Sequence, residues 1–215
     1  MEKPGRSQLG ELFLSTWHER LGWHGYSADP GRIERVPGGI VVYHYTRPEH
    51  LAAIAHSGLV ARRPVVNGER SVDLRGRYQI DALLEPLPRW LAESPSFGDL
   101  GLQMLRVMVG DLLVRIELPV GFPGLYVADF AHPLECLHHE RRGRAPLGLG
   151  YDCGTGHDSM LAYLHSYVPL PEYDGGHLAP VVHVLRSGPG VVIPGPAIHV
   201  ADQQPLRAGN WSECP

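Results

Sequence analysis

The stretch Tyr43-His44-Tyr45-Thr46 carries the side chain best suited to binding a ligand. Residues 40–45 are β-branched and aromatic, which predicts a strand that ends at a turn. Because neighbours in a strand point to opposite faces, His44 and Thr46 share one face, and Tyr43 and Tyr45 share the other. An imidazole at the rim of a sheet can bind a ligand. The alternative is a half-buried histidine that bonds to a backbone carbonyl.

The sequence around this strand resembles the opening motif of the ADP-ribosyltransferase superfamily. In VVYHYTRPEHLAAIAHSGL, the pattern YHYT is followed by a short helix of the form xxLxxIxxxGL. The resemblance implies that His44 binds a ribose hydroxyl of NAD. It also implies that the backbone of Tyr45 holds the nicotinamide amide, with Thr46 completing the cofactor-binding motif.

Two later stretches are similar to the other motifs of this superfamily. The segment Gly124-Leu125-Tyr126-Val127-Ala128-Asp129 resembles the pattern GxYxxD, whose tyrosine stacks on the nicotinamide ring. The third motif is an acidic residue that bonds a ribose hydroxyl, and Glu172 is the candidate. A more usual position lies near Val181, which cannot polarise the sugar. A fixed carboxylate beside the ribose favours the positive charge that builds up as the nicotinamide bond breaks. Tyr126 and Glu172 are therefore the predicted catalytic residues.

An arginine-rich segment follows the first motif. Its members are Arg62, Arg63, Arg70, Arg75 and Arg77, with Arg89 beyond. Arginine grips phosphates bidentately, so the resemblance implies that Arg62 or Arg75, or else Arg63 or Arg77, meets the NAD pyrophosphate. The alternative is a solvated loop. Nucleic acid is a possible partner, but the formal net charge of −4 gives it no support.

A second group of side chains has the chemistry of a zinc site. It comprises His132, Cys136, His138, His139, Cys153 and His157. Zinc sites usually contain ligand pairs with a two-residue spacing, which this group lacks. Arg141, Arg142 and Arg144 would also repel a cation. The prediction is that no metal binds.

The elements that must position these residues are short, because 26 glycines and 20 prolines interrupt the chain. Hydrophobic spacing predicts a helix over 8–22 and a loop over 24–39. Thr46 and Glu49 form a capping box for a helix that ends at Gly58. Further helices are expected around 80–92, 132–140 and 157–166. Further strands are expected at 112–118, 124–129, 181–186, 190–193 and 197–200, with 181–186 and 190–193 meeting at a Gly-Pro-Gly turn.

This pattern predicts an α+β fold, because strands do not alternate regularly with helices. The expected architecture is a split antiparallel β-sandwich with flanking short helices, as in the ADP-ribosyltransferases. The length of 215 residues suits one domain. Within it we expect an N-terminal helix and loop over 1–39, a catalytic core over 40–200 and a loose tail over 201–215.

The predicted function is transfer of ADP-ribose from NAD to a protein, a nucleic-acid base or a small molecule, with release of nicotinamide. A toxin-like role follows from the resemblance. The alternatives are an NAD glycohydrolase, a degenerate protein that binds a nucleotide or a partner without turnover, and a metal-dependent nucleic-acid enzyme built on the histidines. The first residues contain no uninterrupted apolar segment, and no stretch approaches 18 consecutive apolar residues. A cytoplasmic location without membrane contact is therefore expected.

Overall fold

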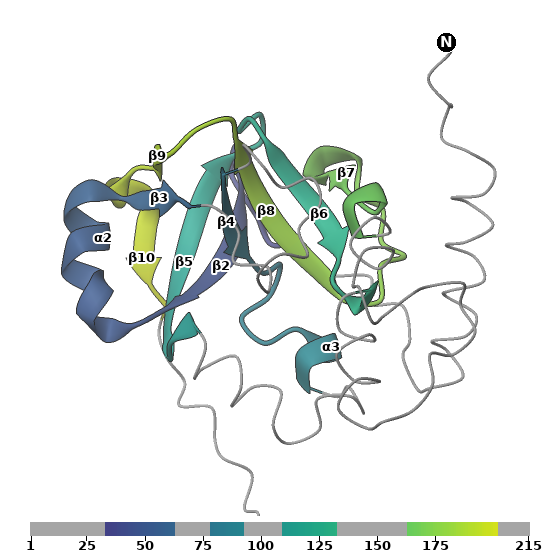
Figure 1. Cartoon of the computed structure of the whole chain (residues 1–215), viewed down its shortest axis with the longest axis horizontal. Coiled ribbons are helices and arrows are strands. Elements are labelled where there is room, and N and C mark those ends of the chain that lie inside the picture. The colour runs from purple at the N-terminus through teal and green to yellow at the C-terminus, as the bar shows by residue number, and fades with distance from the viewer. Residues whose placement is uncertain (1–32, 63–77, 93–108, 133–162, 202–215) are drawn as a thin grey trace, which may run out of the picture.

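The computed structural model describes residues 33–62, 78–92, 109–132 and 163–201 (Figure 1). Its strands are β1 (Arg35–Val36), β2 (Gly39–Thr46), β3 (Leu59–Ala61), β4 (Tyr78–Ala82), β5 (Leu112–Pro119), β6 (Leu125–Asp129), β7 (Val168–Pro169), β8 (Pro180–Arg186), β9 (Gly190–Ile193) and β10 (Ile198–Val200). The helices are α2 (Leu51–Ser57) and α3 (Arg89–Ala92), with 3-10 turns η1 (Pro48–His50), η3 (Leu170–Glu172) and η4 (Gly195–Ala197).

The strands form two four-stranded sheets and one two-stranded ribbon. The first sheet has the order β1-β2-β5-β10 and the second the order β4-β8-β6-β7, while β3 pairs with β9. Every pairing between these described strands is antiparallel. The expected α+β class is confirmed in this form, with mostly antiparallel sheets and few, short helices.

The two large sheets meet between β2 and β4. Tyr43 and Leu83 form an isolated antiparallel bridge, with backbone bonds of 2.9 and 2.7 Å in the two directions. Arg62 and Gln79 form a second bridge, which joins the β3–β9 ribbon to β4. Figure 1 shows the resulting path across the molecule, from β10 and β5 through β2 and β4 to β8 and β6. We call the region around the Tyr43–Leu83 bridge the seam.

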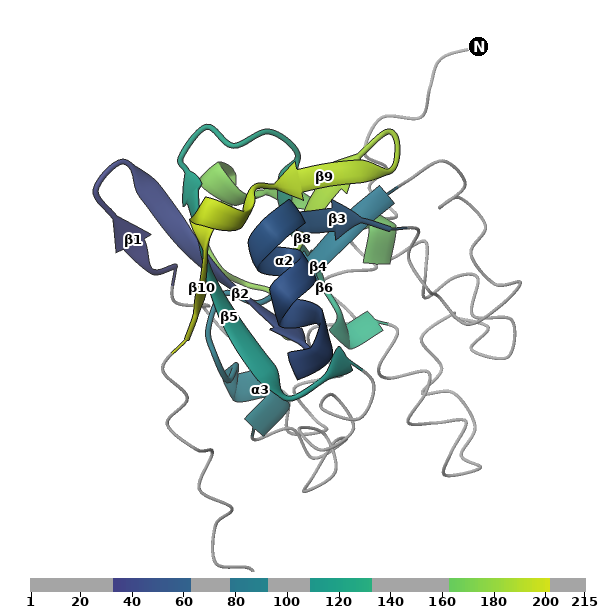
Figure 2. The ribbon, with the colours of Figure 1, turned by 90° about the vertical axis from the view of Figure 1, so that its left-hand side faces the viewer.

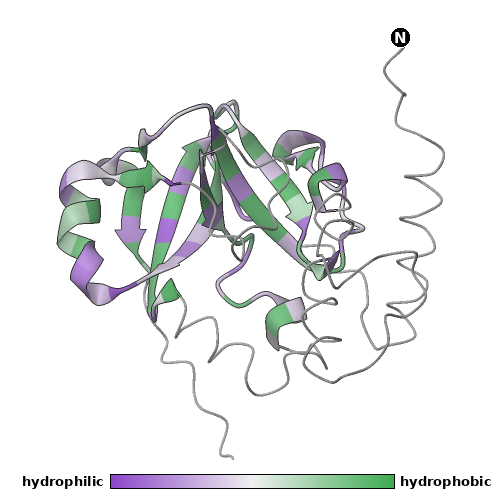
Figure 3. Ribbon diagram, viewed as in Figure 1, coloured by the Kyte–Doolittle hydropathy of each residue, from purple (hydrophilic) through white to green (hydrophobic). Residues whose placement is uncertain are grey.

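Alternation of side chains along the strands builds two hydrophobic clusters. Even-numbered residues of β2 and β5, such as Val42, Val114 and Ile116, are fully buried in one cluster. It also receives residues from the second sheet and α2, including Ile54, Ile80, Leu125, Val127, Val182 and Val184. Bands of hydrophobic and hydrophilic residues alternate along β5 in Figure 3. The predicted half-buried strand over 112–118 is thus confirmed.

The second cluster lies on the opposite faces of the same strands. Tyr43 and Tyr45 of β2 join it, so the predicted division of faces within the YHYT stretch is confirmed. Other members come from segments far apart in the sequence, and include Leu83, Trp90, Leu113, Ala128, Tyr163, Leu178 and Val181. The indole nitrogen of Trp90 donates to the carbonyl oxygen of Pro180 at 3.2 Å. This cluster ties α3 to the start of β8.

The helix after β2 ends as predicted but begins differently. Figure 2 shows α2 beside the β3–β9 ribbon. Gly58 ends the helix with φ of 82°, and its N–H donates to the carbonyl oxygen of Ile54. The predicted capping box is wrong, because Thr46 is the last residue of β2 and is buried. Arg47 precedes η1 without any side-chain cap, and Pro48 starts that turn.

Three other predictions about elements need correction. The helix expected over 80–92 is wrong: Tyr78–Ala82 is strand β4, paired with β8, and only Arg89–Ala92 is helical. The loop expected over 24–39 contains β1 and the first residue of β2, which pair across a turn at Gly38. The strands expected at 181–186 and 190–193 are both present, but they do not form a hairpin, because β4 and β6 flank β8 while β9 pairs with β3.

Several predicted elements lie wholly or mostly outside the described residues, namely the helices over 8–22, 132–140 and 157–166 and the tail beyond 201. Within the described ranges, no helix is both long and apolar enough to cross a membrane.

Candidate functional site

His44 lies where β2 and β4 separate. Beyond the Tyr43–Leu83 bridge, the next carbonyl of β4 that points toward β2 belongs to Asp81. The Nδ1 atom of His44 donates to this oxygen at 2.6 Å. The imidazole therefore replaces the backbone donor that a longer strand pairing would have supplied. This is the carbonyl-bonded histidine that the sequence left open as an alternative to ligand binding.

The bond to Asp81 fixes the tautomer of His44. A carbonyl oxygen can only accept, so Nδ1 carries the hydrogen and Nε2 is an acceptor in the neutral ring. Burial lowers the pKa of His44, and its bond and attraction to Asp81 oppose this shift only in part. The ring is therefore neutral at pH 7. No described residue forms a hydrogen bond with Nε2, which can accept one from a ligand hydroxyl.

The side chain of Asp81 turns to the face opposite His44. There it lies in a row with its cross-strand partner His183 on β8 and with Tyr126, the partner of His183 on β6. His183 Nδ1 donates to Asp81 Oδ1 at 2.7 Å, and the amide of Gln79 donates to the same oxygen at 2.5 Å. The side chain of Asp81 is 66% exposed, whereas that of His183 is 4% exposed.

The charge on Asp81 is favoured by these donors. Partial desolvation by the surrounding protein raises the pKa of this carboxyl, but the hydrogen bonds and charge interactions, those with His183 above all, outweigh it, so the net pKa lies below the usual value. Both donors use Oδ1, and no described residue bonds to Oδ2. Within the described residues, Asp81 is thus an ionised, positioned carboxylate of which one oxygen accepts two hydrogen bonds and the other accepts none.

Tyrosine rings surround His183 on its other sides. The ring of Tyr167 stacks on His183, with centroids 5.3 Å apart and 16° between the planes. The hydroxyl of Tyr163 contacts His183 Nε2, and burial raises the pKa of Tyr163 well above its ordinary value. Tyr126 lies 6.2 Å from Tyr167, centroid to centroid. The stacked ring of Tyr167 and the hydroxyl of Tyr163 hold the His183 ring in the orientation that bonds Asp81.

The structure does not bring all the predicted site residues together. His44 shares its face with Val42 and Val114, while Tyr126 lies on the face that carries His183. Glu172 is exposed in η3, next to β7 at the far edge of the second sheet. Three strand spacings, about 14 Å, separate that edge from β4. Val181 lies on β8, 8% exposed, and contributes to the second hydrophobic cluster.

The other predicted cofactor-binding residues have varied surroundings. The hydroxyl of Tyr45 donates to the carbonyl oxygen of Pro86 at 2.7 Å, so this side chain holds the segment after β4. Thr46 is only 4% exposed. Arg62 is exposed and lies opposite Gln79. Arg75 lies outside the described residues.

The hydrogen bonds of Asp129 give this residue a structural role. This carboxylate is 1% exposed and accepts backbone N–H bonds from Ala131, Leu178 and Ala179 at 2.9–3.1 Å. Its own N–H donates to the hydroxyl of Ser166 at 2.8 Å. The last position of the GxYxxD pattern therefore fixes the entry into β8.

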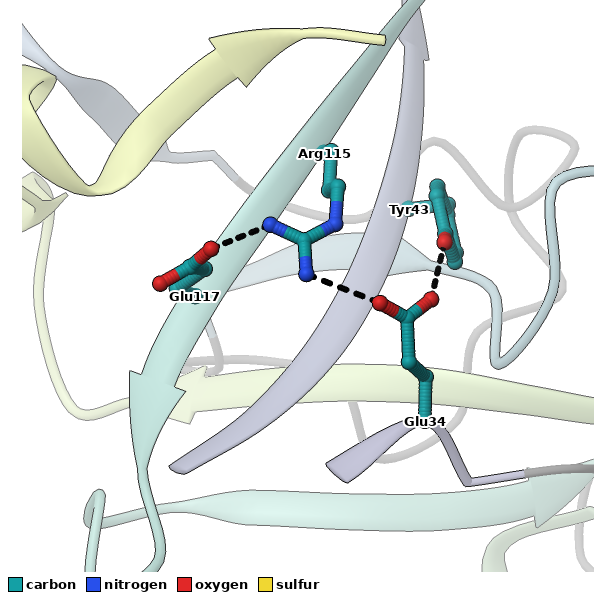
Figure 4. Close-up of polar contacts among 4 residues, drawn as sticks. All are labelled: Glu34, Tyr43, Arg115 and Glu117. Carbon is teal, nitrogen blue, oxygen red and sulfur yellow. Dashed lines mark hydrogen bonds and ion pairs between the residues drawn. The ribbon is translucent and has the colours of Figure 1, made fainter. Parts of the chain in front are cut away.

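A polar cluster covers the outer side of β2 and β5 (Figure 4). Arg115 bonds Glu34 at 2.8 Å and also contacts Glu117 closely, while the hydroxyl of Tyr43 donates to Glu34. Burial and the bond to Glu34 raise the pKa of Tyr43 to about 12. The bonds from Tyr43 and Arg115 lower the pKa of Glu34. The guanidinium of Arg115 is already paired with the carboxylates of Glu34 and Glu117. The cluster therefore holds Glu34 against the sheet, and we call these four residues the clasp.

The candidate site residues that the sequence did not single out are Asp81 and His183. They are 102 positions apart and come together only through the pairing of β4 with β8. A local signal existed in the alternation of Tyr78, Ile80 and Ala82, which is typical of a strand and places Asp81 on the opposite face.

The predicted metal ligands fall mostly outside the described residues. Of the six, only His132 is described, and it is fully buried. In the part of the chain that is described, no three His, Cys, Asp or Glu side chains gather in a way that could hold a metal ion. No family model, curated protein or solved structure matches the chain.

Proposed function

We propose that the protein is an NAD-dependent mono-ADP-ribosyltransferase with an ADP-ribosyltransferase-like fold. Two lines support the proposal: the YHYT motif at 43–46, and the antiparallel sheets that meet at the strand carrying it. NAD supplies the ADP-ribosyl group, with nicotinamide as the leaving group. The acceptor is a protein, a nucleic-acid base or a small molecule.

The observation that carries the proposal is the state of His44. Its Nδ1 is bonded to the Asp81 carbonyl and its Nε2 is an acceptor in a neutral ring. A ribose presents hydroxyl donors, which suit such an acceptor. Because β4 holds the ring in place, a ligand does not have to order it, and the cost of binding is lower.

Charge stabilisation is the second requirement of the reaction. Breaking the bond between nicotinamide and ribose builds positive charge on the sugar, and a fixed carboxylate favours that charge in the transition state. Glu172 fulfils this role in the motif assignment. The backbone carbonyl of Asp81 accepts the bond from the His44 ring, while the carboxylate of Asp81 lies on the opposite face of β4. Tyr126 lies on the same face as Asp81 and provides an aromatic surface.

Nicotinamide release from NAD by the full chain tests the proposal. We expect the wild type to release nicotinamide, and His44→Ala to lower kcat/KM roughly tenfold or more, through loss of a positioned acceptor. His56→Ala is the matched control, since His56 is an exposed histidine of α2 in the same segment. Thermal melting of each variant checks folding.

Glu172→Ala belongs in the same series. Loss of release in this variant would place the catalytic acid at the far edge of the second sheet. Full release would move the acid elsewhere and leave the proposed function intact. If the wild type neither bound NAD nor released nicotinamide, the proposal would be refuted.

A binding protein without turnover is the second candidate. Two observations favour it: Val181 occupies a buried position where the superfamily usually has its acid, and Glu172 lies in the turn after β7, the edge strand about 14 Å from β4. Isothermal titration separates the two candidates. Binding of NAD without nicotinamide release, in the presence of any acceptor tested, would favour the binding protein.

A further inference from the structure

A single imidazole interrupts the apolar sequence of β8, an inner strand of the second sheet. His183 lies between Val182 and Val184, which are fully buried, and is itself buried. A buried polar side chain is tolerated when its polar atoms have hydrogen-bond partners. Both ring nitrogens of His183 have one, because Nδ1 bonds Asp81 and Nε2 contacts the hydroxyl of Tyr163.

The buried imidazole holds a carboxylate that lies at the surface. Asp81 accepts bonds from His183 and Gln79 through Oδ1, while no described residue bonds to Oδ2. The side chain of Asp81 is exposed, and an exposed ion pair adds little to the stability of a fold. The main effect of these bonds is therefore to orient the carboxylate. A ligand then has less side-chain freedom to remove on binding.

An aromatic ring lies beside this carboxylate on the same face of the sheet. Tyr167 stacks on the ring of His183, with the two centroids 5.3 Å apart, and His183 is the residue that bonds Asp81. Tyr167 is also partly exposed. The surface thus combines one oriented negative charge with an aromatic group, and this combination suits a cation.

The surface distinguishes between the two cationic groups that are common in proteins. The ammonium group of lysine is strongly hydrated and has three donors, for which this surface offers one charged acceptor. A guanidinium group is more weakly hydrated and planar. It can donate to a carboxylate oxygen while its flat side packs against aromatic rings. The guanidinium group of arginine is therefore the better fit.

We propose that the Asp81 carboxylate and the neighbouring ring of Tyr167 form a binding site for an arginine side chain of a partner protein. The site is separate from the proposed dinucleotide contact, because the His44 ring and the Asp81 carboxylate lie on opposite faces of β4. Arg62 lies opposite Gln79 and faces the same side as Asp81, but it forms no ion pair with Asp81. Oδ2 of Asp81 accepts from the guanidinium.

The test titrates the full chain, without NAD, with N-acetyl-arginine methylamide and N-acetyl-citrulline methylamide, and follows binding by NMR. Citrulline has nearly the same shape as arginine but carries a neutral urea group. We expect the wild type to bind the arginine probe roughly fivefold more tightly, the effect of one partly exposed charge pair. Asp81→Asn should remove this difference. Asparagine can still accept from His183 and Gln79, so the variant removes the charge with little change of shape.

Further measurements make the test specific. Asp174→Asn is the matched control, because Asp174 is an exposed aspartate away from β4, and it should keep the difference between the probes. Arg62→Gln should tighten binding of the arginine probe roughly twofold, because it removes a like charge from the same face. In the wild type, a higher ionic strength should reduce the difference, since salt screens an exposed pair. That measurement does not depend on the folding of any variant.

The outcomes separate this site from the proposed function. If the wild type binds both probes equally, or if Asp81→Asn keeps the difference, the arginine site is refuted. Loss of the difference in Asp174→Asn would also refute it, because the effect would then follow from net charge. Nicotinamide release without binding of the arginine probe would refute this site alone. Binding of the arginine probe by a protein that neither binds NAD nor releases nicotinamide would support this site and refute the proposed function.

Discussion

At the scale of single residues, hydrogen-bond geometry decides what each polar group can do. His44 bonds a carbonyl through Nδ1, so its ring is a structural group and a potential ligand acceptor at once. Asp129, the acidic residue of the GxYxxD pattern, accepts three backbone N–H bonds in the interior. Asp81 has the same chemistry and remains exposed, so burial separates the structural acid from the available one.

The clasp at Tyr43 gives a prediction at this scale. The pKa of the Tyr43 hydroxyl is raised from 10 to about 12 in the folded protein, so the neutral phenol stabilises the fold. This contribution is fully present below the unfolded pKa of 10 and is lost as the pH rises toward 12. We expect the free energy of unfolding to fall by about 2 kcal/mol across this window through Tyr43 alone.

Urea unfolding at several alkaline pH values measures this effect. Tyr43→Phe keeps the buried ring and removes the hydroxyl, so its stability should fall less across the same window. Equal slopes in the two proteins would show that Tyr43 does not carry the pH dependence.

At the scale of elements, the close approach of two backbone segments limits which residue can stand at a junction between a helix and a strand. Gly58 ends α2 with φ of 82°, and a Cβ placed on it would lie 2.2 Å from the carbonyl oxygen of Ile193 on β9. The junction of α2 with the β3–β9 ribbon therefore requires a residue without a side chain. Gly38, in the β1–β2 turn, also has positive φ, but a Cβ there would meet no atom within 4 Å.

These two glycines form a matched pair of substitutions. Gly38→Ala should cost about 1 kcal/mol, the strain of the left-handed conformation alone. Gly58→Ala should cost roughly 3 kcal/mol or more, because the clash with Ile193 adds to that strain. Chemical denaturation of both variants gives the comparison. Similar losses in both would mean that the contact with β9 relaxes freely.

At the scale of the whole molecule, the seam joins the two large sheets. One backbone bridge, Tyr43–Leu83, and one side-chain bond, from His44 to Asp81, connect β2 with β4. Backbone pairing ends at this point, so backbone groups and side chains become available to a ligand. The proposed NAD contact at His44 lies at this junction.

His44, at the seam, should also make the free energy of unfolding depend on pH. The pKa of His44 is lowered from 6.5 in the folded protein by burial. Its contribution to stability is therefore present above the unfolded pKa of about 6.5 and is lost as the pH falls through the folded value. Comparing urea unfolding of the wild type and His44→Gln from pH 7.5 to 5 isolates it from the other histidines. The wild type should lose more stability on acidification, and parallel curves would contradict the assignment.

Local patterns in the sequence predict several strands, the end of α2 and the faces of β2. Alternation over 112–118 defines β5 because it depends only on the two-residue period of a strand, and Gly58 marks the end of α2 because glycine adopts positive φ at little cost. The division of faces within Tyr43-His44-Tyr45-Thr46 follows from the same period. Each of these features depends on residues within a few positions of one another.

Only the tertiary structure decided which residues gather at the seam. The helix predicted over 80–92 begins within β4, and Tyr78–Ala82 is a strand because β8 pairs along its whole length. Asp81 meets His183 across 102 residues, and Glu172 is carried to the opposite edge of the sheet by β7. Sequence periodicity specifies the face on which a side chain lies, whereas strand order specifies its neighbours. Strand order is set by the packing of distant segments into a shared core, which no local pattern encodes.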